Sequence, residues 1–123
     1  MPILYTITLI IGSQFVVIHT IAEYFELYWR YGWLDMPVHL IGGVLLTLIL
    51  YTFVLILKYQ PARITLPRLL ALATFPLLVW EVFGVYRYGG LKPGFGIDSS
   101  LDILFGILGV VAGYYIARAL MRI

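Results

Sequence analysis

Seven acidic or histidine side chains of this sequence could do chemistry, and six of them form pairs. They are His19 with Glu23, Asp35 with His39, Asp98 with Asp102, and the single Glu81. Paired residues lie four positions apart, a spacing that places both on one face of a helix, about 6 Å apart along its axis. Imidazole and carboxylate groups act as general acids and bases, and they bind zinc, iron and manganese. The seven side chains are therefore the candidate metal ligands.

The rest of the chain is too apolar for a water-facing globule. Of its 123 residues 63% are apolar and 11% are charged, and the mean hydropathy is +1.01. Ordinary soluble domains have roughly half apolar and about a quarter charged residues. Most of the outer surface must therefore face lipid.

Four apolar runs are long enough to cross a membrane, which takes about 20 residues per helix. They cover about 2–22, 36–57, 67–86 and 101–121. The predicted fold is therefore all-α, an integral membrane four-helix bundle that forms a single transmembrane domain over residues 1–123.

Charge and cysteine content exclude several classes of function. Eight basic and six acidic residues give a formal charge of +2, which is too small for a nucleic-acid partner. The chain has no cysteine, so disulfides, thiolate metal sites, iron–sulfur clusters and cysteine nucleophiles are excluded. Any chemistry must come from oxygen and imidazole groups.

The basic residues predict the orientation in the membrane. Four spans place both termini and the loop between the second and third spans on one side. That side carries five basic residues and the other side three; they are Lys58, Arg63, Arg68, Arg118 and Arg122 against Arg30, Arg87 and Lys92. By the positive-inside rule we expect both termini in the cytoplasm.

All six carboxylates and both histidines fall near the opposite end of the four predicted helices. An ionisable side chain within the hydrocarbon costs at least about 2.5–3.5 kcal/mol, so several of them should face the bundle interior and one another. Carboxylates held close together need shared protons, positive neighbours or a bound cation. We therefore predict one shared divalent metal site, with zinc, manganese or iron as candidates.

Five of these groups also have ordinary structural explanations. Asp35 and Asp98 stand at predicted helix starts and could be N-caps. Glu23 and Glu26 lie toward the interface and could be solvated, and His19 could be a hydrogen-bonded core residue.

His39, Glu81 and Asp102 lie inside apolar runs, where they cannot simply be solvated. Their alternative role is an interhelical hydrogen-bond network that fixes packing. In an enzyme, the candidates for metal ligands or the general base are Asp35, His39, Glu81 and Asp102, with Asp98 and His19 in support.

Glycines mark faces where helices can approach closely. Gly106, Gly109 and Gly113 follow each other at spacings of three and four, and Gly42 and Gly43 are adjacent on the second span. Such faces serve packing within a chain, and they could also bind a membrane partner or a second copy.

The order of these motifs resembles the VanZ-like group of small membrane proteins and related uncharacterised families. The matching residues are Asp35 and His39, then Trp80 and Glu81, then Asp98 and Asp102. The resemblance covers roughly residues 35–113 and not the first helix. Met36 and Asp102 stand where this group usually has lysine and asparagine, which makes this site more acidic. The resemblance implies a prokaryotic cell-envelope protein of a group associated with glycopeptide resistance.

The functional prediction is a membrane protein that binds a divalent cation and the polar head group of a lipid or lipid-linked molecule. If it is an enzyme, hydrolysis or phosphoryl transfer at that head group is the expected class, and the glycine-rich loop with Lys92 could cover the site. The alternatives are a non-catalytic accessory subunit, with the polar cluster as structural glue, and ion or proton translocation.

Overall fold

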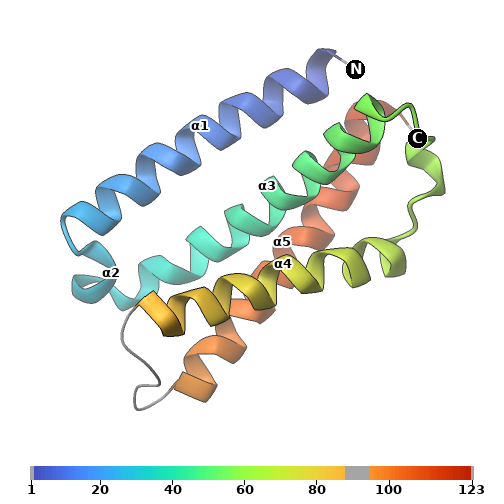
Figure 1. Ribbon diagram of the computed structural model, residues 1–123. Coiled ribbons are helices and arrows are strands. Elements are labelled where there is room, and N and C mark those ends of the chain that lie inside the picture. The colour runs from blue at the N-terminus through green and yellow to red at the C-terminus, as the bar shows by residue number, and fades with distance from the viewer. Residues whose placement is uncertain (1, 88–94, 123) are drawn as a thin grey trace.

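The structure is an all-helical bundle (Figure 1). It is a computed structural model that describes residues 2–87 and 95–122, and the side chains of residues 3–86 and 99–122. Its elements are α1 (Pro2–Tyr24), α2 (Leu27–Arg30), the 3-10 turn η1 (Gly32–Leu34), α3 (Asp35–Ile56), the 3-10 turn η2 (Pro61–Arg63), α4 (Leu66–Arg87) and α5 (Phe95–Met121). In this part of the chain, four helices (α1, α3, α4 and α5) are long and apolar enough to cross a membrane. The predicted all-α four-helix bundle is confirmed.

The observed ends of α1, α3 and α4 agree with the predicted spans to within two residues, whereas α5 begins earlier. It starts at Phe95 instead of residue 101. A search for lipid-facing runs begins only after the polar residues Asp98, Ser99 and Ser100. In the structure these residues are the fourth to sixth of α5, so the helix extends beyond the apolar run on which the prediction rests.

Two short elements between α1 and α3 were not predicted. Glu26 has a positive φ of 55°, and this left-handed residue turns the chain at the end of α1. The helix α2 and the turn η1 then lead into α3. This compact connection places the end of α1 beside the start of α3 (Figure 1).

The closest helix pair is α3 with α5, and glycines allow it. A Cβ atom built on Gly43 would lie 2.9 Å from the backbone nitrogen of Val110, and one built on Gly109 would lie 2.9 Å from the Cα atom of Gly43. Thr47 is buried at the same contact, and its Oγ1 lies 3.4 Å from the carbonyl oxygen of Val110. This part of the glycine face is thus covered within the chain.

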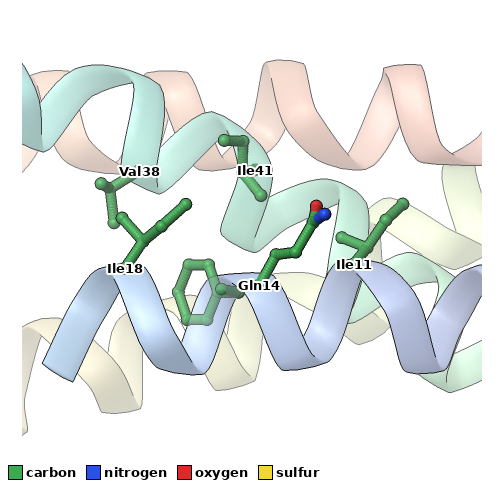
Figure 2. A pocket seen from close by; sticks show the side chains of 6 residues that line it. Ile11, Gln14, Ile18, Val38 and Ile41 are labelled. Atoms are coloured by element: carbon green, nitrogen blue, oxygen red, sulfur yellow. The ribbon is translucent and has the colours of Figure 1, made fainter. Parts of the chain in front are cut away.

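The other two long helices flank this pair. In the described residues, α1 packs mainly on α3 and α4 mainly on α5, while α1 and α4 hardly contact each other. The contact of α1 with α3 leaves a small cavity of about 60 Å³. Figure 2 shows Ile11, Gln14 and Ile18 of α1 around it, facing Val38 and Ile41 of α3.

The bundle has a buried apolar core at one end and polar side chains at the other. The largest buried side chains, including Leu4, Leu48, Tyr51 and Leu69, lie in the half that contains the termini. At the opposite end α1 ends, α3 begins, α4 ends and α5 begins (Figure 1). We call this second end the polar end, because the candidate ligands lie on these four segments. Elsewhere large apolar side chains such as Leu9 and Phe75 are exposed, as expected for contact with lipid.

Candidate metal centre

Asp35 and His39 meet on the first two turns of α3. Oδ1 of Asp35 lies 3.2 Å from Nε2 of His39. Leu34 occupies the N-cap position and Asp35 is the first residue of the helix, so the predicted capping role of Asp35 is wrong. Its carboxylate instead approaches the histidine one turn further along the helix.

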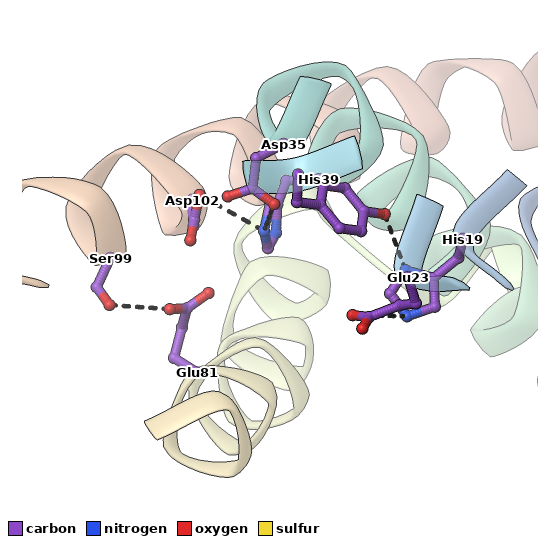
Figure 3. Close-up of polar contacts among 8 residues, drawn as sticks. His19, Glu23, Asp35, His39, Glu81, Ser99 and Asp102 are labelled. Atoms are coloured by element: carbon purple, nitrogen blue, oxygen red, sulfur yellow. Dashed lines mark hydrogen bonds and ion pairs between the residues drawn. The ribbon is translucent and has the colours of Figure 1, made fainter. Parts of the chain in front are cut away.

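Asp102 reaches the same histidine from α5. Its Oδ1 lies 3.5 Å from Nε2 of His39 (Figure 3). The side chains of His39 and Asp102 are only 14% and 17% exposed, whereas Asp35 is 39% exposed. Gly43, where α3 and α5 pack most closely, is one helical turn after His39. This close packing brings Asp102 of α5 within reach of His39.

The three side chains fit a metal ion by geometry and by chemistry. One ligand atom from each of Asp35, His39 and Asp102 lies within 4.8 Å of the others. Ligand atoms bound tetrahedrally at about 2.0–2.1 Å lie roughly 3.3–3.4 Å from one another. The observed separations of 3.2 and 3.5 Å are close to that value. An imidazole with two carboxylates suits zinc, iron or manganese.

Glu81 lies beside this cluster on α4. Its Oε2 accepts a hydrogen bond of 2.9 Å from Oγ of Ser99 on α5. Figure 3 shows its carboxylate directed toward the side of the cluster where Asp102 lies. In the described residues the group of mutually close ligand atoms comprises Asp35, His39 and Asp102, so Glu81 stands next to the group and not in it.

His19 and Glu23 form a separate contact on α1. Nε2 of His19 lies 3.9 Å from Oε1 of Glu23, and Nδ1 lies 2.9 Å from the hydroxyl of Tyr28. The imidazole also stacks on Phe15 and makes an edge contact with Trp80 of α4. His19 and Glu23 were predicted as metal ligands, but they lie apart from the group formed by Asp35, His39 and Asp102.

Two predicted residues lie outside the described part. The backbone of Asp98 falls in the first turn of α5, but its side chain is not among those described, and Lys92 with the glycine-rich loop is not described either. The predicted pairing of His19 with Glu23 is confirmed. The contacts of His19 with Tyr28 and of Glu81 with Ser99 were not predicted, because they join different helices and periodicity along the sequence does not report how helices are rotated against each other.

A cavity of about 700 Å³ is lined both by the His19–Glu23 pair and by the Asp35–His39–Asp102 cluster. Its lining includes His19 and Glu23 on one wall, and Asp35, His39, Glu81, Ser99 and Asp102 on the others. The volume lies within the range of roughly 300–1,000 Å³ that is typical of small-molecule sites. The possible metal ligands therefore face a space that could hold a ligand.

Comparisons with family models, with curated proteins and with solved structures found no match. The resemblance to the VanZ-like group therefore rests on motif order alone and stays a prediction. The structure itself shows, within residues 2–87 and 95–122, four helices long and apolar enough to span a membrane and an Asp, His, Asp group that could hold a metal ion.

Proposed function

We propose that this chain is an integral membrane protein that binds a divalent cation through Asp35, His39 and Asp102. The cation would hold the polar head group of a lipid or lipid-linked molecule. The supporting observation is that three mutually close ligand atoms line a cavity large enough for a ligand. Three protein ligands leave a coordination position open, as in catalytic metal sites, whereas structural sites are usually closed by four.

The reaction class that this arrangement favours is hydrolysis or phosphoryl transfer at the head group. A divalent cation polarises a phosphate oxygen and lowers the pKa of bound water. The carboxylate of Glu81 can accept the proton that such water loses, because it lies in the same cavity and its orientation is fixed by Ser99. In this proposal Glu81 is the general base, and its place in the cavity beside Ser99 supports that role.

The motif order and the basic residues add the cellular context to this proposal. We place the protein in the plasma membrane of a prokaryote, in the cell envelope, with both termini in the cytoplasm. The polar end then lies in the outer leaflet, where head groups of envelope lipids are accessible.

Metal binding tests the proposal directly. The purified protein in detergent is stripped with chelator, and its thermal unfolding is followed as zinc, manganese or iron(II) is added. A cation that binds only the folded state stabilises it by about 2.7 kcal/mol at about 100 times its dissociation constant. We expect the wild-type midpoint to rise with at least one of these metals and Asp102→Asn to abolish the rise.

The matched control is Glu26→Gln, which also removes one negative charge near the polar end. Glu26 is exposed and is not among the residues that line the cavity, so this variant should respond to metal like the wild type. Unfolding that is the same with chelator and with every metal would contradict the proposal. It would support the accessory-subunit alternative, in which the cluster only fixes packing.

A further inference from the structure

The cavity beside the cluster changes character with depth. Its polar lining lies at the polar end, with Asp35, His39 and Asp102. Deeper along α3 and α4 the lining is apolar and includes Leu46, Ile49 and Leu77. A ligand that fills this space must therefore carry a polar group at one end and hydrocarbon at the other.

The depth of the apolar part matches one leaflet of a bilayer. From His39 to Ile49 the helix α3 rises about 15 Å, at about 1.5 Å per residue. The hydrocarbon core of a bilayer is about 30 Å thick. A chain that starts at the cluster and runs to Ile49 would thus occupy the same depth as the tail of a neighbouring lipid.

The cavity is also placed for access from the membrane. Its walls include Phe15 and His19 of α1 and Leu77 and Trp80 of α4, the two long helices that hardly contact each other in the described residues. The contact of His19 with Trp80 joins them at the polar end. The cavity is partly open, and an opening between α1 and α4 would let a hydrocarbon chain enter from the side without leaving the bilayer.

Charge decides which head group fits. Asp35, Asp102 and Glu81 would repel an anion, but a bound divalent cation reverses this local preference. Phosphate oxygens are good ligands for such a cation. We propose that the cavity binds a phosphate-bearing lipid, with the phosphate at the cation and one hydrocarbon chain along α3 between α1 and α4. This inference rests on the proposed metal site and names its ligand class.

The experiment measures how affinity depends on chain length. The metal-loaded protein in detergent is titrated with inorganic phosphate, octyl phosphate and hexadecyl phosphate, and bound species are counted by native mass spectrometry. Buried methylene groups favour binding, so we expect hexadecyl phosphate to bind the wild type at least about tenfold more tightly than octyl phosphate.

Two variants of α3 test where the hydrocarbon chain of the ligand lies. Ile49→Trp fills the deep end of the cavity and should remove the advantage of hexadecyl phosphate while leaving octyl phosphate and metal binding unchanged. The control is Ile56→Trp, two helical turns further along the same face of α3 at an exposed position that is not among the lining residues. It should keep the wild-type chain-length dependence.

A second measurement does not depend on the folding of any variant. A hexadecyl phosphate with a photoreactive diazirine at the chain end should crosslink the wild type at peptides that contain Ile49 or Leu77. Equal affinities for inorganic, octyl and hexadecyl phosphate, or crosslinks spread over the exposed faces, would overturn this inference and leave the metal site intact. A wild-type protein that binds no metal would overturn the proposed function itself, and this inference with it.

Discussion

Nε2 of His39 on α3 lies 3.5 Å from Oδ1 of Asp102 on α5, although α4 separates the two helices in the chain. The contact joins the two helices that pack most closely. The polar cluster therefore lies on the most closely packed pair of the bundle, and its geometry depends on the packing of that pair.

Gly43→Ala should disrupt this packing, because the new methyl group would meet the backbone of α5 near Val110. Overpacking of this kind costs about 1–3 kcal/mol, and here the obstructing atoms are backbone and cannot rotate away. We expect a lower thermal midpoint in detergent together with weaker metal binding.

The neighbouring glycine provides the control for that substitution. A Cβ atom on Gly42 would lie 3.6 Å from a ring carbon of Phe15, an ordinary contact. Gly42→Ala should therefore leave both midpoint and metal binding near the wild-type values. Equal effects of the two substitutions would show that α3 and α5 do not depend on this close approach.

The two histidines should differ in their effect on metal binding. His39→Gln removes the imidazole shared by Asp35 and Asp102, and the dissociation constant should rise by more than about 100-fold, since even outer ligand partners contribute 10–100-fold. His19→Gln should leave it nearly unchanged, because that ring contacts Glu23 on α1 and Tyr28 on α2 and not the Asp35–His39–Asp102 cluster. Equilibrium dialysis with zinc measures both constants, and a larger loss in His19→Gln would move the site to α1.

Glu81→Gln separates catalysis from metal binding. The amide keeps the shape of the side chain but cannot act as a base, and general bases contribute about 10²–10⁴-fold to rates. We expect a loss of this size in the hydrolysis of a lipid phosphodiester, phosphatidylglycerol, with metal affinity retained. Ser99→Ala should cause a smaller loss, because Ser99 only orients the carboxylate through its hydrogen bond. A Glu81→Gln variant with the wild-type rate would exclude Glu81 as the base.

Single cysteines can test the orientation, since the chain has none of its own. Gln60 lies between α3 and α4 and Tyr31 lies between α2 and η1, and both are exposed. With both termini in the cytoplasm, a membrane-impermeant maleimide applied to intact cells should label Tyr31→Cys and not Gln60→Cys. The reverse pattern would invert the proposed topology.

The architecture could be predicted from the sequence because the membrane imposes a simple rule. Each span needs about 20 apolar residues, and the runs around Leu9, Leu48, Leu72 and Leu108 satisfy it independently of tertiary contacts. The start of α5 at Phe95 was not predicted by this rule, because the polar residues 98–100 interrupt the apolar sequence near the beginning of the helix.

The site was predicted less completely. The spacing of Asp35 and His39 revealed their contact, because it lies within one helix. The membership of Asp102, the separate position of His19 and the pairing of Glu81 with Ser99 depend on how helices are rotated and how closely they approach. Those quantities are set by side-chain packing between distant segments, which local periodicity does not contain.

The contact of Gly43 with Gly109 has a consequence for biogenesis. These glycines join α3 to a helix that the ribosome makes only after α4. A nascent chain that has inserted α1, α3 and α4 carries Asp35 and His39 but not Asp102, and so it presents two of the three ligands. In the proposed metal site the full set of three ligands therefore forms only after α5 has inserted, which would make ion capture a late step of assembly.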